Sequence, residues 1–403
     1  MRILITSCTY APALNGQAIF TVGLAEGLAK RGHEVRVITG SDSSGPYAGL
    51  QKGVRMERLW SVNLTSFHPD SYYPFFYSQR VHRIFEEFRP EIVHIQDRFP
   101  LSVRIFHEAK RREIKIIGTN HFMPENLAPY IPLLSMAKPL YNRIMWNWML
   151  AIYNHLDLVT TQSRAAAELV RSKGLSVPVF PVSCGIDLNR FHPIPSIDRL
   201  ACRARYGLDP NRKIFLFVGR LDREKRVDVL LHALKRSGRD DIQLVVAGRG
   251  AAQGAYESLA NSLGLGERVR FTGFIPNEDL HNLLNSVDVF SMPSEAELLS
   301  IASLEALACG RPVLLADAVA LPELVTPGVN GYLFKPGDST DAARFMSLLA
   351  DHPEQWQAMG RASVEKARTH SLESTILRYE TLYGALLKGV LPEPSLILNQ
   401  ISQ

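Results

Sequence analysis

The sequence PSEAELLSIASLEALACGRPV, residues 293–313, has the pattern of a loop that leads into a helix and then into a strand. Ile301, Leu304 and Leu307 recur at roughly helical spacing, so they predict one buried helical face. Gly310 suits the left-handed position that ends many helices, and Pro312 stops the helix. The apolar residues that follow predict a strand. This succession is typical of one unit of a parallel α/β sheet.

Two glutamates in this stretch, Glu297 and Glu305, are candidates for ligand binding. Ser294 and Glu297 have the spacing of a capping box, and Ser300 is a second candidate N-cap. The start of a helix attracts anions, because its free N–H groups and its dipole point at the ligand. Two interpretations stay open from spacing alone. One is a site for a ligand with hydroxyls and phosphate, and the other is a capped surface helix with two solvated glutamates.

Apolar runs that predict strands alternate with helical patterns along the whole chain. In the first half they are Arg2–Thr6, Glu34–Thr39, Glu91–Ile95, Lys115–Thr119, Leu158–Thr161 and Val177–Val182. In the second half they are Lys213–Gly219, Gln243–Gly248, Arg268–Thr272, Val287–Met292, Pro312–Ala316 and Gly331–Phe334. The alternation in both halves predicts an α/β fold with two parallel sheets.

Composition and spacing also predict where the domains begin and end. A proline-containing stretch of mixed charge, 186–212, separates the two halves. We expect a Rossmann-like first domain over 1–190 and a second over 191–375. The last segment, 376–403, should hold a helix that packs back towards the first domain and a loose tail. Ligands of such sheets bind at the carboxyl ends of the strands, so the cleft between two facing domains is the expected site.

Bulk composition is that of an ordinary soluble globular protein, with 46% hydrophobic and 21% charged residues among 403. The chain has no run of 18 apolar residues, and its start, MRILITSC, predicts a strand rather than a signal peptide. The four cysteines are scattered, which argues against a zinc site or a disulfide framework and favours a reducing compartment. We therefore expect a cytoplasmic protein that holds no metal.

The net charge of +5 is unevenly distributed. Residues 1–190 hold 22 Lys and Arg against 15 Asp and Glu, whereas the remainder is mildly acidic. A basic first half suits contact with anionic lipid or a polyanion, and scattered solubilising charge is the alternative. Since no recognisable nucleic-acid module accompanies the charge, we expect no nucleic-acid partner.

The second half contains a candidate phosphate site, in the sequence VGRLDREKRVD that follows an apolar strand. Arg220 and Lys225 lie on the same strand-to-helix connection, and two cations there suit a diphosphate. The alternative is a charged loop held by its own carboxylates. The sequence VAGRG, which includes Gly248, ends another strand with glycines and allows a ligand to approach the backbone closely.

The first half contains weaker candidates. Asn15-Gly16 has the residue types of a tight turn, or of a loop that approaches a sugar or phosphate closely. His121 ends an apolar strand, where it could hydrogen-bond a substrate hydroxyl or move a proton, although a lone histidine is more often structural. The stretch 123–150 mixes Trp, Tyr and Leu with basic residues. It suits a membrane interface or an apolar acceptor, or else a long loop and a core helix.

Together these segments resemble the family 4 retaining glycosyltransferases of the GT-B fold. The resemblance covers roughly residues 1–385. It depends on the ordered segments YAPALNGQ, GTNH, VGRLDREKRVD, FTGFIPNEDL, PSEAELLSIASLEALACGRPV and ALPELVTPGVNGYLF. It implies a nucleotide-sugar donor, such as UDP-glucose, held mainly by the second domain without a metal or another cofactor.

The resemblance also assigns roles to individual residues. Arg220 and Lys225 would bind the donor diphosphate, and Glu305 would hold the ribose hydroxyls. The implied catalytic set is His121, Glu297, Arg220 and Lys225. The implied donor-binding set is Gly16, Arg220, Lys225, Gly248, Phe274, Ile275, Glu297, Leu298, Leu299, Ser300 and Glu305.

The chain departs from the family pattern at several positions. Leu298 and Ser300 replace glycines that let backbone N–H groups approach the sugar, which puts the identity of the sugar in question. Arg226 stands where glycine is common. The Asn15-Gly16 pair and the stretch 123–150 look similar to the branch that glucosylates diacylglycerol.

The function implied by the resemblance is retaining transfer of a hexose to an acceptor hydroxyl. The first hypothesis is a membrane lipid or lipid-linked acceptor, with peripheral contact at the inner face of the membrane through the basic first domain. The second is a small soluble acceptor, such as a sugar phosphate or an inositol derivative. A hypothesis of another class is a sugar-nucleotide-binding protein without catalysis.

Overall fold

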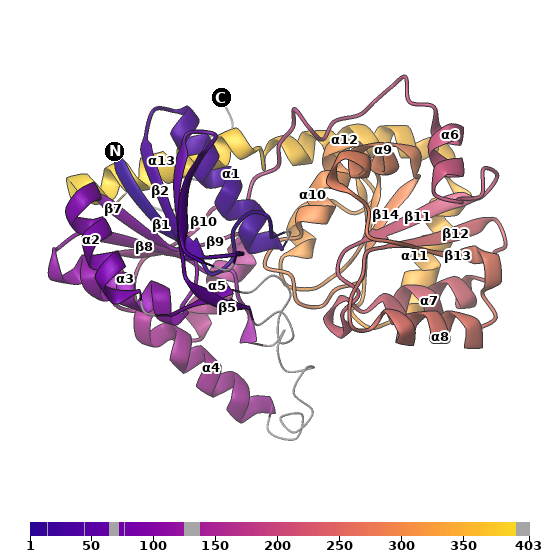
Figure 1. The fold of residues 1–403 in the computed structure, drawn as a ribbon. Coiled ribbons are helices and arrows are strands. Elements are labelled where there is room, and N and C mark those ends of the chain that lie inside the picture. Colours follow the sequence, from indigo (N-terminus) through magenta and orange to yellow (C-terminus); the bar gives the residue numbers. More distant parts are fainter. Residues whose placement is uncertain (14, 44, 64–71, 76, 125–137, 392–403) are drawn as a thin grey trace. The chain divides into compact units, whose positions relative to one another are not determined.

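The computed structural model describes residues 1–13, 15–43, 45–63, 72–75, 77–124 and 138–391, which form two α/β units (Figure 1). The first unit holds the described residues up to 185 together with those from 372 onward, and the second holds 186–371. The chain thus changes units at Gly185–Ile186 and at Ser371–Leu372, a few residues before the expected boundaries at 190 and 375. The tail beyond 391 lies outside the described residues.

The first unit is built on an eight-stranded sheet in the order β10-β9-β8-β7-β1-β2-β4-β3. Its strands are β1 Arg2–Thr6, β2 Glu34–Gly40, β3 Tyr47–Gln51, β4 Val54–Leu59, β7 Ile92–Ile95, β8 Lys115–Thr119, β9 Leu158–Thr161 and β10 Val179–Pro181. A separate pair joins β5 Ser61–Asn63 to β6 Tyr72–Pro74. The helices are α1 Gly16–Lys30, α2 Ser78–Phe88, α3 Pro100–Arg111, α4 Lys138–Tyr153, α5 Arg164–Ser172 and α13 Leu372–Lys388.

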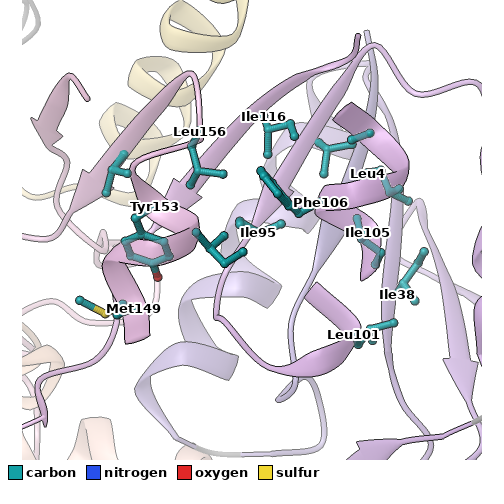
Figure 2. Close-up of a cluster of buried hydrophobic side chains, with 14 of the residues drawn as sticks. Leu4, Ile38, Ile95, Leu101, Ile105, Phe106, Ile116, Met149, Tyr153 and Leu156 are labelled. Atoms are coloured by element: carbon teal, nitrogen blue, oxygen red, sulfur yellow. The ribbon is translucent and has the colours of Figure 1, made fainter. Parts of the chain in front are cut away.

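A hydrophobic core joins α2, α3 and α4 to the sheet of the first unit (Figure 2). Ile95 and Ile116 contribute to it from the strands, Ile105 from α3, and Met149 and Tyr153 from α4. The part of the 123–150 stretch that forms α4 therefore packs partly into the core, as one of the two interpretations expected.

The sequence did not predict β3 and β4, which form a hairpin at one edge of this sheet. β3 pairs antiparallel with β4, whereas β4 continues the parallel order from β2. Lys52 and Gly53 at the turn both have positive φ, 46° and 82°, which is typical of a tight hairpin turn. The edge strand is largely exposed, and charged residues interrupt β4, so neither carries an apolar run.

The last helix, α13, completes the first unit through a buried polar network. His94 on β7 lies 2.8 Å through Nδ1 from the Tyr383 hydroxyl and 2.7 Å through Nε2 from Thr119 Oγ1. The Tyr379 hydroxyl lies 3.0 Å from Thr160 Oγ1 and 3.2 Å from Thr119 Oγ1. Burial holds the pKa of His94 well below its usual value, so this imidazole is neutral. The network connects three neighbouring strands to α13.

The second unit is built on a six-stranded parallel sheet in the order β13-β12-β11-β14-β15-β16. Its strands are β11 Lys213–Val218, β12 Ile242–Ala247, β13 Val269–Gly273, β14 Val289–Met292, β15 Val313–Ala316 and β16 Gly331–Phe334. Its α-helices are α6 Arg199–Arg205, α7 Val227–Ser237, α8 Gln253–Ser262, α9 Asn277–Ser286, α10 Ile301–Ala308, α11 Ser339–Asp351 and α12 Trp356–Arg368. Short 3₁₀ turns are Arg223–Lys225, Gly266–Arg268, Leu321–Leu324 and Pro353–Gln355.

The strand order of each sheet reverses at one point, and ligands of open α/β sheets bind outside the carboxyl ends of the strands there. In the second unit the chain runs outward from β11 to β13, then restarts on the other side with β14. In the first unit the corresponding neighbours are β1 and β7. The loops that follow these four strands are therefore the first places to look for a site.

Candidate functional site

Two predicted residues meet at the switch point of the second unit. Lys225 lies on the 3₁₀ turn after β11, and Glu297 lies in the loop between β14 and α10. Lys225 Nζ and Glu297 Oε1 are 2.6 Å apart, and the two side chains are only 18% and 11% exposed. The two motifs, far apart in sequence, thus supply one cation and one carboxylate to a single edge of the sheet.

Arg220 follows β11 on the same connection. Its Nη2 lies 3.2 Å from Asp222 Oδ2 and 3.4 Å from Glu224 Oε1, while the side chain is 38% exposed. Asp222 Oδ1 also accepts a hydrogen bond of 3.3 Å from the backbone N–H of Ala251. The carboxylates of the loop therefore hold a partly exposed guanidinium in place, so the charged-loop interpretation and the phosphate interpretation are compatible.

Arg226 occupies a backbone conformation that explains why glycine is common there in the family. Its φ is 53°, in the left-handed region, between the 3₁₀ turn and the start of α7. The guanidinium binds the carboxylates of Glu295 and Asp228. These ion pairs offset part of the strain that a side chain carries at this position.

Gly248 has a structural reason for being glycine. Its φ is 140°, and a Cβ added there would lie 1.9 Å from the carbonyl oxygen of Gly219. Its N–H donates to the carbonyl of Gly273 at 2.8 Å. The backbones that leave β11, β12 and β13 are therefore packed directly against one another. The role of Gly248 in donor binding stays a prediction.

The start of α10 differs in part from the expected capping pattern. The helix begins at Ile301, and Ser300 is its N-cap, with Oγ accepting from Ser303 N at 3.2 Å. Of the two candidate caps, Ser300 is the one used, and Glu297 lies three residues before this N-cap rather than within a capping box at the start of the helix. Gly310 has a φ of 71°, so the expected left-handed end of the helix is confirmed.

Two buried leucines follow Glu297, and the first of them, Leu298, stands where the family commonly has glycine. Leu298 and Leu299 are 7% and 8% exposed, directly after Glu297. After β13, Phe274 is 48% exposed and Ile275 is buried. These residues follow carboxyl ends of strands in the same sheet, which fits their predicted place beside a donor, although their contacts with one stay predictions.

Glu305 lies in the middle of α10, partly buried. Burial raises the pKa of its carboxyl to about 7, and the charge of Arg190 offsets only part of this effect. A carboxyl that is poorly solvated without a ligand is suited to accept hydrogen bonds from hydroxyls. This environment fits its predicted role with the ribose, which stays a prediction.

Replacing Glu305 with glutamine is expected to flatten the dependence of thermal stability on pH. The folded protein holds this proton up to about pH 7, whereas the ordinary value is 4.5. Its contribution to stability is therefore fully present below pH 4.5 and is lost as the pH rises through about 7. Melting temperatures measured from pH 4.5 to 7.5 should fall less steeply in the variant, and equal slopes would contradict the assignment.

Gly16 in the first unit is the first residue of α1, so the tight-turn alternative is wrong, while its close approach to a sugar or phosphate stays a prediction. Asn15 is the N-cap of α1, and its Oδ1 accepts from Ala18 N at 3.0 Å. Asn15 Oδ1 also accepts from Thr9 Oγ1 at 3.2 Å. The residue types of a turn and of an N-cap overlap, because a short amide side chain satisfies backbone N–H groups in both.

His121 is held between two glutamine side chains. Nε2–H donates to Gln96 Oε1 at 2.7 Å, and Nδ1 accepts from Gln162 Nε2 at 2.6 Å. Burial lowers the pKa of His121 to about 3, so the ring is neutral at physiological pH. Both ring nitrogens are thus engaged, which disfavours proton transfer by this ring. The predicted place of His121 beside the sugar stays a prediction.

The described part of α4 has an exposed apolar line as well as its buried side. Leu140, Ile144 and Trp148 are 59%, 55% and 40% exposed at helical spacing. Residues 125–137 of the interface-like stretch lie outside the described residues.

Across the described ranges, none of the helices has the length and apolar character to span a membrane. Those same ranges contain no group of three His, Cys, Asp or Glu that could hold a metal ion.

Two family models cover most of the chain between them. Residues 14–190 match the model described as Glycosyltransferase Family 4, and residues 198–366 match Glycosyl transferases group 1. The chain belongs to glycosyltransferase family 4. Its two units with parallel sheets are the GT-B architecture expected from the sequence. The cleft expected between the domains stays a prediction.

The relatives found by sequence comparison are also glycosyltransferases. A D-inositol 3-phosphate glycosyltransferase from Mycobacterium sp. (strain KMS) is 37% identical over 206 residues, 50% of this chain and 45% of the relative. A GDP-mannose-dependent alpha-mannosyltransferase from Corynebacterium glutamicum is 28% identical, over 83% of this chain and 76% of the relative. The match to the first relative thus spans about half its length. The narrower likeness to the diacylglycerol branch stays a prediction.

Among solved structures, sucrose-phosphate synthase from Thermosynechococcus elongatus superposes with a TM-score of 0.79. The match covers 96% of this chain and 99% of the other, at 22% identity. At that identity the likeness bears on the fold alone.

Proposed function

We propose that this family 4 protein transfers a hexose, with retention of configuration, from a nucleotide diphosphate sugar to an acceptor hydroxyl. The observation that carries the proposal is the contact of Lys225 with Glu297 at the switch point, beside the partly exposed Arg220. A diphosphate is bound by cations, and the hydroxyl groups of a sugar are bound by a hydrogen-bond acceptor such as a carboxylate. Both are present on one sheet edge.

The chemistry follows from these charges. The bond between the anomeric carbon and the diphosphate oxygen breaks, and a bond to the acceptor oxygen forms. The acceptor's proton passes to the departing phosphate, so no covalent nucleophile is required. Lys225 and Arg220 stabilise the negative charge that develops on the leaving group, which is usually the largest catalytic contribution. Glu297, released from Lys225 by the diphosphate, accepts hydrogen bonds from the sugar.

A neutral His121 fits this scheme as a positioning residue, because its two ring nitrogens are already engaged by Gln96 and Gln162. Its ring orientation is fixed by Gln96 and Gln162 before any substrate binds. Fixing a side chain in advance reduces the entropy lost on binding. The role that the family assigns to His121 near the reacting face of the sugar needs no proton transfer by this ring.

For the acceptor, the relatives' names favour a small polyhydroxy compound, and we propose this class first. A lipid or lipid-linked acceptor is the second candidate. The exposed line of Leu140, Ile144 and Trp148 favours it, because an apolar helix face beside basic residues suits the surface of an anionic membrane. In that case the protein would act at the inner face of the cytoplasmic membrane.

A panel of donors with mass detection of products tests the proposal. UDP-glucose, GDP-mannose and other nucleotide sugars would be incubated with soluble polyols, with and without lipid extract. We expect one donor to give a product heavier by one hexose, or slow release of free hexose when no acceptor fits. If the protein binds no nucleotide sugar and shows no turnover, the proposed transferase function is wrong. Co-sedimentation with anionic vesicles at several salt concentrations separates the two acceptor classes.

A further inference from the structure

Large apolar side chains are exposed on the β5–β6 hairpin of the first unit as well as on α4. In the hairpin, Trp60, Val62 and Phe75 are 41%, 39% and 46% exposed. The rings of Trp60 and Phe75 meet edge to face, with centroids 6.2 Å apart. Val62 pairs with Tyr73 across the two strands, and cross-strand pairs project from the same face. Since residues two apart in a strand also share a face, the hairpin presents these side chains on one side.

Aromatic rings connect the hairpin to α4. The ring centroid of Phe99 lies 5.1 Å from that of Tyr73 on β6 and 6.5 Å from that of Trp148 on α4. Trp148 is the last residue of the exposed line on α4, a helix that extends outward from the lower side of the unit in Figure 1. We call this surface the apolar face, and its members are Trp60, Val62, Phe75, Leu140, Ile144 and Trp148. Soluble monomers rarely expose so many large apolar side chains together, which indicates a binding partner.

Positive charge lies beside the apolar face. α4 itself contains no Asp or Glu. An open hollow of about 460 Å³ between α4 and the end of α5 is lined by Arg143 and Lys173, and none of the described residues that line it is acidic. Lys173 Nζ lies 5.7 Å from the centroid of the Trp146 ring, and the Arg98 guanidinium lies 4.1 Å from that of Trp148. The apolar face is thus bordered by cations.

The hollow also offers hydrogen-bonding groups. Asn142 Oδ1, in its lining, is buried and has no hydrogen-bond partner among the described residues. The Ser172 hydroxyl donates to the Leu169 carbonyl at 2.7 Å, so its oxygen can still accept. A guanidinium and an ammonium bind phosphate, and acceptor oxygens bind hydroxyls. This set fits the headgroup of phosphatidylglycerol, which carries a phosphate next to free hydroxyls.

We propose that the apolar face docks the first unit on an anionic phospholipid bilayer, and that the hollow binds the phosphate of one lipid headgroup through Arg143 and Lys173. Trp and basic side chains both favour the membrane interface, where apolar parts enter the acyl boundary and charged parts stay with the headgroups. None of these residues belongs to the predicted catalytic or donor-binding sets. The inference rests on the proposed function for its purpose, because docking would bring the transferase to a lipid or lipid-linked acceptor.

A second copy of this chain fits the surface less well than a bilayer does. In a two-fold symmetric dimer the same patch lies on both subunits. Arg143 and Lys173 would then approach the same cations of the second copy, and like charges across an interface repel. An anionic bilayer instead supplies the counter-charge for both cations and a hydrocarbon boundary for the apolar face.

Co-sedimentation of the full chain with vesicles, without donor or acceptor, tests the proposal. The probe vesicles contain phosphatidylglycerol mixed with phosphatidylcholine, and the reference vesicles contain phosphatidylcholine alone. We expect binding to the anionic vesicles to be about 10- to 100-fold tighter, the range for two cations at an anionic surface. This preference should decrease as the salt concentration rises, because exposed charges are screened.

Variants in the two parts of the surface should have different effects. Ile144→Asp should weaken binding to both kinds of vesicle about ten-fold or more, because it places a charge in the apolar boundary. Arg143→Gln/Lys173→Gln should remove most of the preference for phosphatidylglycerol and leave binding to phosphatidylcholine unchanged. The matched controls are Leu50→Asp on β3, where the side chain is 76% exposed, and Arg83→Gln at an exposed position of α2. Both controls should bind like the wild type.

Equal binding of the wild type to both kinds of vesicle, or to neither, would overturn this inference, and this comparison decides even if a variant does not fold. Self-association that Ile144→Asp abolishes, without vesicle binding, would also overturn it and assign the apolar face to a second copy. Turnover of a nucleotide sugar with a soluble acceptor would then leave the proposed function standing. Vesicle binding without any donor binding or turnover would instead overturn the proposed function and keep the docking surface.

Discussion

Replacing Lys225 with alanine is expected to lower turnover about 100- to 1,000-fold. The reason is that Lys225 would stabilise the charge on the leaving diphosphate, and loss of one such group costs about this factor. The effect should appear in kcat, because the charge is larger in the transition state than in the bound donor. Steady-state kinetics with the donor found in the panel would measure it.

The controls use the partner of Lys225 and a neighbouring cation. Lys225→Ala alone leaves the carboxylate of Glu297 without its cation, at a cost of about 1–3 kcal/mol in stability. The double variant Lys225→Ala/Glu297→Gln should regain stability but not turnover, which separates catalysis from folding. Arg223→Ala removes an exposed cation from the same 3₁₀ turn and should keep wild-type kinetics. Wild-type turnover in Lys225→Ala would remove Lys225 from the mechanism.

Replacing Gly248 with alanine is expected to destabilise the protein by about 3 kcal/mol or more. Alanine is strained at a φ of 140°, and its Cβ would lie 1.9 Å from the carbonyl oxygen of Gly219, so the ends of β11 and β12 must separate. A loss of this size corresponds to a fall in melting temperature of about 6–12 °C for a unit of this length. Differential scanning calorimetry would measure it.

Gly254 provides the matched control for this prediction. It lies in α8 of the same unit, and a Cβ added there meets nothing within 4 Å. Gly254→Ala should therefore be neutral or stabilising, by up to about 1 kcal/mol, because alanine is the better helix former. If both variants have the melting temperature of the wild type, the close packing of the strand ends does not contribute to stability.

Most of the fold could be predicted because the buried parallel strands are continuous apolar runs. The twelve expected strands all have counterparts, which differ at their ends by two residues at most. The hairpin of β3 and β4 could not be predicted in this way. Its edge position leaves β3 exposed, and the sequence RMER in β4 mixes charged residues with one methionine. Exposure and charge remove the apolar signal on which such predictions depend.

The residues that meet at the carboxyl edge of the second sheet could be predicted from the sequence. Arg220, Lys225 and Glu297 belong to segments with their own spacing, and they lie on one edge because the carboxyl ends of parallel strands do so. The hydrogen bonds of Gln96 and Asp97 in the first unit were missed, because single polar residues have no spacing to recognise. A signal was available in Gln96-Asp97-Arg98, three polar residues directly after a buried strand. Their separate roles depend on hydrogen bonds that only the fold defines.

The polar network of the first unit has a consequence for how the protein is made. His94, Thr119 and Thr160 are translated early, whereas Tyr379 and Tyr383, which pair with them, are translated more than 200 residues later. Domains generally fold as units during synthesis. All strands of the second unit are translated before α13. The second unit can therefore fold while the first still lacks Tyr379 and Tyr383. The first unit is therefore completed after the second, once α13 has left the ribosome.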